Sequence, residues 1–451
     1  MFIPAILLIE SLLLAAILLS RRPKLLVPAV VALLPVEFAG ALLYEQGAEL
    51  VGSLANPGKL LMAATVLVVA YRERHDLSRL FPSSRLVVPL LALLVVMVLA
   101  VTWSDRLVPP NAVVILPLYV AFVFAAPALI EDRCDVERIL GAFLLATIVL
   151  ALLAIGQRGG VFTWREALVR ADGTGYRSNA TFADPNILAR FLAISLALAG
   201  GLVLVTGPRR LTLYLAVPAI GLGSLAIIAT ASRSGWLMLV LCAAVVIVMA
   251  PADRWTKVKL TAGGAVALGG LLGFLLVQGG EYAQRVATLT DATELLGARQ
   301  GLIRAGWAMF LDNPVVGVGA GNFQRSLLFN YLDLVPLWQL ATLSHTSVIT
   351  VLSEMGIVGA ALFGLVGIRI AVAMGSAYTR ARSPWSRLVC AWLVAAVLGV
   401  FLHSQSEGRL VEEPFLWVLL ALVVAVETRP LLLAGATADT GSEADRAALA
   451  A

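Results

Sequence analysis

Long apolar segments alternate with short polar ones along the chain. Each apolar run has about 20 residues, enough to cross a bilayer core of about 30 Å. The runs are continuously apolar and lack a period of two, so they predict helices rather than the strands of a membrane barrel. The segments that fit this pattern are 2–19, 25–44, 58–71, 86–103, 111–130, 139–157, 187–206, 211–230, 234–250, 258–278, 346–374, 388–403 and 414–427.

This pattern predicts an all-α polytopic membrane protein with about 12–13 transmembrane helices, of which 58–71 is the shortest. One long external loop interrupts the series, and its segment "ARQGLIRAGWAMFLDNP" has the spacing of an amphipathic surface helix that ends by Asn313. The expected parts are N-terminal helices (1–157), central helices with an arginine-bearing loop (158–278), the long external loop (279–345), C-terminal helices (346–430) and a disordered cytoplasmic tail (431–451).

Composition strengthens the membrane assignment. The chain is 60% hydrophobic and 14% charged, and its mean hydropathy is +0.93, which excludes an ordinary soluble protein. The three cysteines are far apart and indicate neither a disulfide framework nor a metal site. At the N-terminus the charges follow the apolar run, so we expect a retained first span and not a secretory signal.

The distribution of basic residues predicts the sidedness of the loops. "SRRPK", "RERHDLSRLFPSSR", "GPRR", "PADRWTKVK" and "GSAYTRARSPWSR" are basic, and they alternate with loops that are not rich in lysine and arginine. The basic loops should face the cytoplasm, which places the loops 158–186 and 279–345 on the outer side. Three of the four lysines, Lys24, Lys257 and Lys259, lie on the inner side in this arrangement.

The outer loops nevertheless carry many arginines. Guanidinium groups bind phosphate through two parallel hydrogen bonds and stay charged when half-buried, so an anionic ligand would explain them. For any single arginine, contact with lipid headgroups is the alternative. The outer arginines are Arg158, Arg165, Arg170, Arg177, Arg233, Arg285, Arg299, Arg304, Arg325 and Arg409.

Two outer segments combine such an arginine with a helix start. In "GTGYRSNATFADPNILA", Asp184 is a candidate N-cap for the following span, and Arg177 and Asn186 should lie beside that helix N-terminus, which favours anions. In "ATASRSGW", Arg233 follows Ser232 at the outer ends of two spans. Arg233 either snorkels to the headgroups or binds an anion that its small neighbours allow to approach.

The long loop contains "GARQGLIRAGWAMFLDNPVVGVGAGNF". Its glycines match a phosphate loop poorly, because no strand precedes them and no Gly-Lys-Ser/Thr follows; tight turns are the better interpretation. Arg299 and Arg304 are about 140° apart on a helix, so one can bind a ligand while the other meets headgroups. Asn322, in the same motif, is a further candidate for substrate binding.

His345 begins the segment "SHTSVITVLSEMGIVG" at the outer end of the span 346–374. An imidazole with a pKa near 6.5 accepts a proton from a hydroxyl at neutral pH; the alternative is a hydrogen-bonding residue at a helix start, with Ser344 or Thr346 as the cap. Glu354 lies about 900° further around the helix and should bond elsewhere in the bundle.

In this order, "ADPNILA", "SRSGW", the block from Arg299 to "NPVVGVGAGNF", and "SHTSVITVLSEMGIVG" resemble the O-antigen ligase and polysaccharide polymerase superfamily of bacterial inner membranes. The similarity extends over roughly residues 175–365, and "HSQSEGRLVEEPFLWVLLAL" resembles the family's last segment. The family often has Asn after the histidine, where this chain has Thr346. Counting back from "DNP", Arg299 rather than Arg304 takes the position of the family's loop arginine.

The resemblance implies a metal-independent, inverting glycosyltransferase with a fold related to the GT-C class, acting on the periplasmic face of the inner membrane. The donor would be a glycan on undecaprenyl diphosphate, and the acceptor a lipid A–core sugar in a ligase or a lipid-linked repeat unit in a polymerase. We expect contact with membrane lipids, no cofactor and no nucleic acid. Arg233 and Arg299 would stabilise the departing diphosphate, and His345 would take the proton of the acceptor. The expected substrate-binding residues are Arg177, Arg304, Asn186, Ser232 and Asn322.

The sequence also leaves open a metal site and a transport function. If a metal binds, Glu412 and Glu413 are the first candidates, although no Asp-x-Asp occurs in the chain. A transporter or lipid-linked glycan flippase would place charges along a path through the membrane, for which the sequence offers Glu10, Glu37 and Arg369 on separate spans. The charges instead gather at the outer edge, which favours an enzyme.

Overall fold

In the computed structural model the described residues are 21–37, 56–76, 80–104, 111–161, 177–206, 209–278, 292–336, 344–429 and 432. Within these ranges the chain forms helices and turns and no strand, so the all-helical prediction is confirmed. The expected span 2–19, the end of the span 25–44, the tail after 432 and Glu10 lie outside the described residues.

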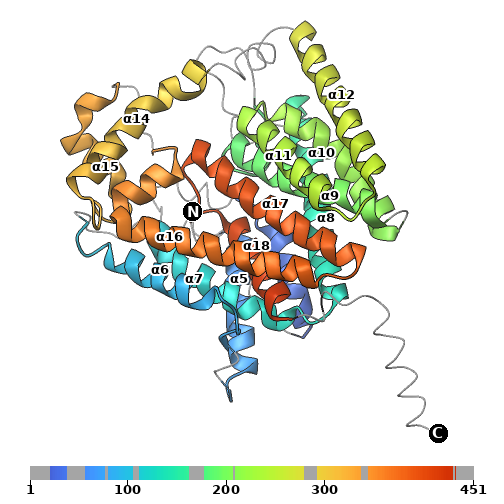
Figure 1. Cartoon of the computed structure of the whole chain (residues 1–451), viewed down its shortest axis with the longest axis horizontal. Helices are drawn as coiled ribbons and strands as arrows, with labels where there is room; N and C mark the ends of the chain where they lie inside the picture. Colours follow the sequence, from blue (N-terminus) through green and yellow to red (C-terminus); the bar gives the residue numbers. More distant parts are fainter. Residues whose placement is uncertain are drawn as a thin grey trace.

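Helices follow one another along the whole described chain (Figure 1). Short turns of 3₁₀ helix cover Pro23–Leu25, Ala126–Leu129 and Leu332–Leu334, and a π-helical turn covers Thr212–Ala216. The α-helices are α2 (Leu26–Leu33), α5 (Pro57–Arg72), α6 (Val87–Leu99), α7 (Asn111–Ala125), α8 (Arg133–Arg158), α9 (Pro185–Thr206), α10 (Val217–Ala229), α11 (Arg233–Met249), α12 (Arg254–Gln278), α14 (Ala292–Asp312), α15 (Phe323–Asn330), α16 (Ser347–Arg380), α17 (Pro384–Glu407) and α18 (Pro414–Thr428).

Several of these helices have the dimensions of membrane spans. Among the described residues, five stretches are long and apolar enough to cross a bilayer: Arg133–Arg158, Pro185–Val205, Thr212–Ala229, Ser347–Arg380 and Pro384–Glu407. Shorter apolar helices cover Pro23–Leu33, Val87–Leu99, Val113–Leu129, Arg233–Met249 and Pro414–Thr428. The chain is therefore a membrane protein with several spans.

The core of the bundle lies where α9, α11 and α17 pack against one another, with α18 beside them. Helix α18 is apolar on all sides, and its residues from Phe415 to Val426 are buried, which is the placement expected of a helix without a polar face. Aromatic rings from different helices meet at this centre, with Phe191 and Phe415 4.8 Å apart between ring centroids. The bundle thus holds its helix ends in fixed positions.

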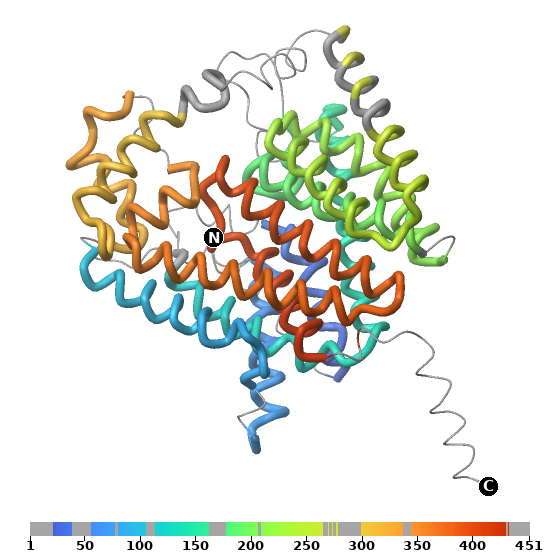
Figure 2. Tube along the Cα trace, in the orientation of Figure 1, coloured from blue at the N-terminus to red at the C-terminus, as the bar shows by residue number. Residues whose placement is uncertain are grey.

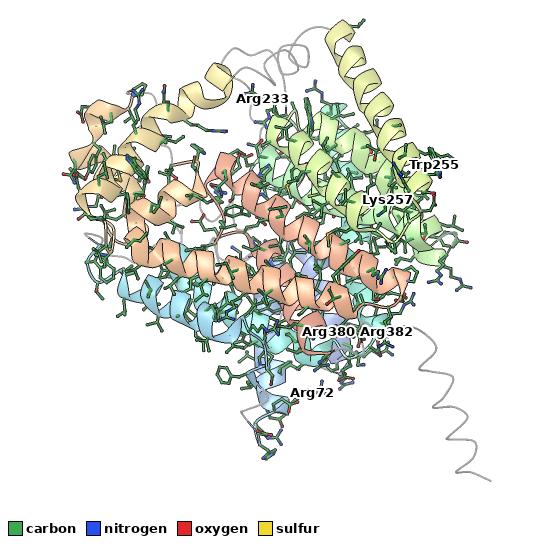
Figure 3. The ribbon with its side chains drawn as sticks, in the orientation of Figure 1. Arg72, Arg233, Trp255, Lys257, Arg380 and Arg382 are labelled. Carbon is green, nitrogen blue, oxygen red and sulfur yellow. The ribbon has the colours of Figure 1, made fainter. Side chains whose placement is uncertain are left out.

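One end of the bundle is basic. Lys24 forms ion pairs with Glu131 and Asp135 before and in the first turn of α8, and Arg380, at the end of α16, donates to the carbonyl of Glu427. Lys257 donates to the carbonyl of Val248 near the end of α11. Figure 3 shows Arg380, Arg382 and Lys257 well separated from Arg233, which starts α11. These basic residues therefore lie away from the start of α11; the sidedness of the loops stays a prediction.

Helix α16 contains a break that the sequence did not predict. The expected span 346–374 is uninterrupted, but Gly356 has φ 59° and ψ −157°, so the helix is split into a short first part and a long second part. The loop after α14 docks at this break: the N–H groups of Val318 and Gly319 donate to the carbonyls of Ser353 and Glu354, and Ile357 N–H donates to the Pro314 carbonyl. The break leaves backbone groups without helical partners, and the loop satisfies them.

The glycine-rich loop is thus a docking segment. Gly317, Gly319 and Gly321 all have positive φ, as the turn interpretation predicts, and a Cβ at Gly317 would lie 2.3 Å from the Glu354 carbonyl carbon. Glu354 accepts from the N–H groups of Gly321 and Phe323 at 2.8 and 3.1 Å. It therefore bonds to a segment outside its own helix, as the sequence predicts. In Figure 2, α14 and α15 lie over the end at which α16 begins.

Candidate active site

The N-terminus of α9 carries the first group of predicted residues. Asp184 accepts from the N–H of Asn186 at 2.6 Å, so its capping role is confirmed and Pro185 opens the helix. The segment before it is held from behind, because Gln157 Oε1 accepts from the N–H groups of Asn179 and Ala180, both at 3.0 Å. This support fixes the approach of the chain to α9.

Arg177, Asn186 and Ser232 meet at this helix end. The Arg177 guanidinium donates from Nε to the Thr230 carbonyl at 2.9 Å and from Nη2 to Asn186 Oδ1 at 2.7 Å. Ser232 donates to the same Asn186 oxygen at 2.7 Å and also caps α11 by accepting from Gly235 N–H. Three residues that the sequence proposes for substrate binding therefore form one hydrogen-bonded group.

Arg233 is the first residue of α11, directly beside this group. The turn before it is tight, since Ala231 has φ 48°, and Gly235 allows close packing, because a Cβ there would lie 2.4 Å from the Cβ of Ala189. Arg233 is half-buried and lies at the end of the bundle opposite the basic loops (Figure 3). The structure thus places Arg233 next to the α9 N-terminus.

His345 lies across the site, before α16. It has φ 55°, and Gly408 packs against its backbone, because a Cβ at Gly408 would lie 3.0 Å from the His345 Cα. Burial lowers the pKa of the imidazole below its usual 6.5, and the positive charges of Arg299 and Arg409 lower it further; Asp184 acts in the opposite direction. The ring is therefore neutral at neutral pH.

Contacts with the end of α17 hold this segment in place. Thr346 occupies the N-cap position of α16, but its side chain makes no capping bond; its hydroxyl donates to the Gln405 carbonyl at 3.4 Å. Ser347 donates to the Ser404 carbonyl at 3.0 Å. Thr346, which departs from the family pattern, therefore joins His345 to α17.

The two arginines of α14 have different surroundings. Arg299 is half-buried, and its charge acts on His345, whereas Arg304 is exposed. Helix α14 ends at Asp312, before Asn313 as predicted. Arg299 and His345 therefore share one site, although 46 positions separate them in the sequence.

Asn322 lies in the docking loop. It is buried, and its Nδ2 donates to the Val318 carbonyl at 2.9 Å within the loop. Its side-chain oxygen Oδ1 has no partner among the described residues. The contact that the structure shows is thus a structural one, and the substrate-binding role of Asn322 stays a prediction.

Arg190 and His403 are polar residues that the sequence argument missed. Arg190, in the second turn of α9, is 1% exposed and forms an ion pair with the buried Glu413. Its Nε donates to His403 Nδ1 at 3.1 Å. The expectation that Glu10, Glu37 and Arg369 are the charged candidates within the spans is wrong, because it omits Arg190. The sequence does show an arginine five positions after Pro185 in an otherwise apolar helix, which could have identified it.

The acidic residues of the last loop do not form a metal site in the described part of the chain. No group of three or more His, Cys, Asp or Glu side chains there is arranged to hold an ion, and Glu413 is paired with Arg190. The surrounding protein desolvates Glu412 and raises the pKa of its carboxyl, although Arg409 and Lys59 oppose this effect. Glu37 accepts from the N–H of Ala183 at the same end of the bundle.

This end of the bundle can therefore bind an anion and accept a proton. Arg177 is bonded at the N-terminus of α9, Arg233 starts α11 directly after Ser232, and Arg299 and Asp184 both act electrostatically on His345. A developing negative charge would meet fixed guanidinium groups, and a hydroxyl would meet an imidazole.

One family model matches the part of the chain that carries several of these residues. The family model described as O-antigen ligase matches residues 218–364, which extend from α10 into α16 and include Ser232, Arg233, Arg299 and His345. No curated protein matches the chain. The match supports the resemblance of this chain to the O-antigen ligase and polysaccharide polymerase superfamily.

Proposed function

We propose that this protein is a metal-independent, inverting glycosyltransferase that moves a glycan from undecaprenyl diphosphate to an acceptor hydroxyl. The observation that carries the proposal is that Arg299 and the α9 cap Asp184 both act on His345, while Arg177 is bonded to Asn186 at that same helix end. Arg233 starts α11 directly after Ser232, which is bonded to Asn186 as well. The superfamily match supports lipid-linked glycans as the class of substrate.

The arginines suit the leaving group of this reaction. When the acceptor oxygen attacks the anomeric carbon, the bond from that carbon to the diphosphate oxygen breaks, and negative charge grows on the diphosphate. Guanidinium groups fixed before the reaction stabilise this charge without rearrangement, which is the role we assign to Arg233 and Arg299. Arg177 and Asn186, beside the N-terminus of α9, would hold the diphosphate oxygens, with Arg304 further out.

His345 has the protonation state that a general base needs. Because burial and two neighbouring arginines keep its ring neutral, it has a lone pair to accept the proton of the acceptor hydroxyl. The same positive charges limit its basicity, so His345 would act while the acceptor attacks and not before it. The transferred proton would then reside on the imidazole.

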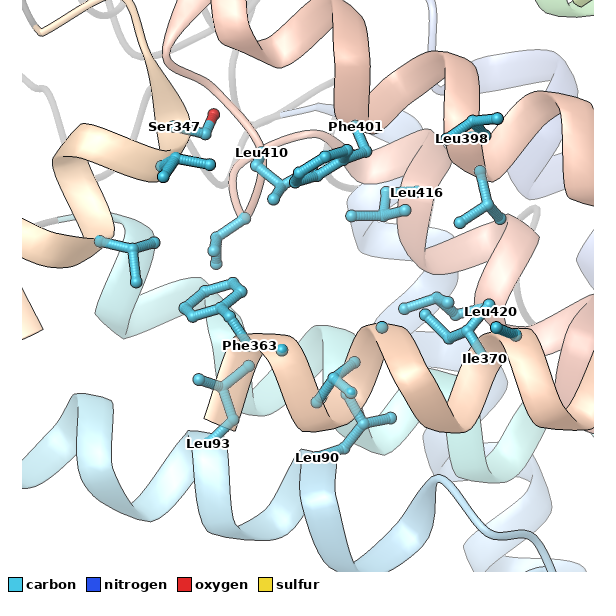
Figure 4. A pocket seen from close by; sticks show the side chains of 18 of the residues that line it. Leu90, Leu93, Ser347, Phe363, Ile370, Leu398, Phe401, Leu410, Leu416 and Leu420 are labelled. Atoms are coloured by element: carbon cyan, nitrogen blue, oxygen red, sulfur yellow. The ribbon is translucent and has the colours of Figure 1, made fainter. Parts of the chain in front are cut away.

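An apolar cavity beside the site supports a lipid-linked substrate. It has a volume of about 520 Å³ and lies between α6, α16, α17 and α18 (Figure 4). Among the described residues that line it, Ser347 alone has a hydroxyl, amide or charged side chain. Leu410 and Val411, which also line it, stand in sequence between Arg409 and Glu412. An isoprenoid tail in this cavity would leave its diphosphate near His345, because Ser347 in the lining is two positions from His345.

The sidedness of the site follows from the basic loops. We place the end with Arg380 and Lys257 in the cytoplasm and the arginine-histidine site at the periplasmic face of the inner membrane. A fold related to the GT-C class and a long periplasmic loop carrying α14 and α15 are part of the same proposal. We favour a ligase with lipid A–core as acceptor; a polymerase that joins lipid-linked repeat units is the second candidate, since it needs the same diphosphate site.

Transfer by the purified protein tests the proposal. The protein in detergent would be given a glycan on undecaprenyl diphosphate together with either lipid A–core or a second lipid-linked unit. Transfer to lipid A–core identifies a ligase, and chain extension identifies a polymerase. Arg233→Ala, Arg299→Ala and His345→Ala should each abolish transfer while the protein still inserts into the membrane. Near-normal transfer by all three variants would refute the assignment. Absence of transfer in detergent, together with movement of the lipid across the bilayer of reconstituted vesicles, would favour a flippase.

A further inference from the structure

A continuous row of polar side chains crosses the bundle beneath the candidate site. It begins at the buried pair of Arg190 and Glu413 and passes through His403 of α17 to Ser234 of α11. Ser232 and Asn186 complete it at the N-terminus of α9. Arg190 and His403 are 1% and 3% exposed, so these bonds form in a medium of low polarity, where each one is strong.

The direction of every bond in this row is determined by chemistry. An arginine only donates, so His403 Nδ1, 3.1 Å from Arg190 Nε, must carry a lone pair, and the ring proton lies on Nε2. That proton points to Ser234 Oγ at 3.2 Å. Ser232 uses its only proton toward Asn186 Oδ1, so Ser234 must donate to Ser232, 3.3 Å away.

Asn186 receives the end of this row. The atom that faces Arg177 Nη2 must be the carboxamide oxygen, since arginine cannot accept. With Ser232 as the second donor, both lone pairs of Oδ1 are occupied. No described residue accepts a hydrogen bond from Asn186 Nδ2, so the two N–H groups of the amide remain for a ligand.

We propose that His403 is a positioning residue that acts through Ser234 and Ser232 to orient the Asn186 amide, so that Nδ2 donates to a diphosphate oxygen of the donor lipid. This inference rests on the proposed function and adds residues to its site. An amide that could rotate would present oxygen instead of N–H to the anion in part of the molecules. The row removes that alternative, because a rotated amide would place two N–H groups against two donors.

Ser234 is the position at which the row is best cut. Ser234→Ala leaves the bonds of Arg190 with Glu413 and His403, and that of Arg177 with Asn186, while it removes the link to Ser232. We expect the KM for undecaprenyl-diphosphate-linked glycan to rise about tenfold, the scale of one hydrogen bond to a charged group, with kcat changed far less. Ser234→Thr, which keeps the hydroxyl, should retain the native KM.

A double-mutant cycle separates positioning from a structural effect. If Ser234 acts through Asn186, Ser234→Ala should add nothing to Asn186→Ala. Additive losses, or native kinetics in Ser234→Ala, overturn the inference. His403→Asn interrupts the row at its other end, because it keeps an acceptor for Arg190 and lacks the Nε2 donor. This variant replaces Ser234→Ala in the cycle if Ser234→Ala lowers the midpoint of thermal unfolding.

Arg233→Ala in the same assay distinguishes failure of the proposed function from failure of the positioning role of His403. Loss of transfer in Arg233→Ala with native kinetics in Ser234→Ala overturns the row alone and leaves the proposed function standing. Native kinetics in both variants overturn the row and the role of Arg233; if Arg299→Ala and His345→Ala also transfer normally, the proposed function is refuted as well.

Discussion

The break in α16 gives the most direct test of how the site is assembled. Gly356 has φ 59° and ψ −157°, a conformation that is essentially restricted to glycine. A methyl group there would lie 2.4 Å from the carbonyl carbon and oxygen of Val315 and 2.7 Å from the N–H nitrogen of Val316. These are backbone atoms and cannot rotate away, so Gly356→Ala must strain the backbone or push the docking loop off the break.

The magnitude follows from the two contributions. A non-glycine residue in this conformation costs about 1–3 kcal/mol. The two bonds nearest the new methyl, Ile357 N–H to Pro314 at 2.9 Å and Val358 N–H to Val315 at 3.2 Å, contribute about 0.5–1.5 kcal/mol each. We therefore expect Gly356→Ala to destabilise the protein by about 2–6 kcal/mol. Since the loop follows α14 and holds it against α16, Arg299 should also move away from His345, and the rate of transfer should fall.

Thermal unfolding of the purified protein in detergent, together with the transfer assay, measures both effects. Gly375→Ala is the matched control, because Gly375 lies in the same helix and a Cβ there meets nothing within 4 Å. The control should unfold and transfer as the native protein does. Equal midpoints for Gly356→Ala and Gly375→Ala would show that the docked loop does not hold the break.

Four further outcomes are expected. Glu413→Ala leaves the Arg190 guanidinium buried without its carboxylate and should cost about 3–5 kcal/mol of stability in thermal unfolding; a native midpoint would contradict the buried ion pair. Arg299→Lys keeps the positive charge but loses the planar guanidinium, so transfer should be slower than in the native protein. Full activity would show that Arg299 contributes only its charge and not its two parallel hydrogen bonds. The acid limb of the rate profile should lie below pH 6.5, because His345 must be neutral to act; Arg409→Gln removes a positive neighbour and should move that limb upward, whereas a downward shift would exclude His345 as the base. Excess chelator should leave transfer intact, and strong inhibition would reveal a metal.

Much of the fold could be predicted because it depends on local patterns. Apolar runs of membrane length predicted the helices, because a span of about 20 apolar residues can be recognised within one segment. Asp184 and the docking-loop glycines were predicted from residue type, since a helix cap and a positive φ each have a narrow choice of side chains. The break at Gly356 was missed because glycine also occurs within uninterrupted membrane helices.

Sequence patterns are sufficient to predict the class of protein, its helices and the residue types that can bind an anion. The contacts of Arg190 with Glu413 and of His403 with Ser234, pairs separated by 223 and 169 positions, become known from the packing of the helices. Hydropathy and capping depend on residues within one or two helical turns of each other, so they can be recognised in the sequence. Contacts between distant helices depend on how whole faces pack, and no single segment carries that information.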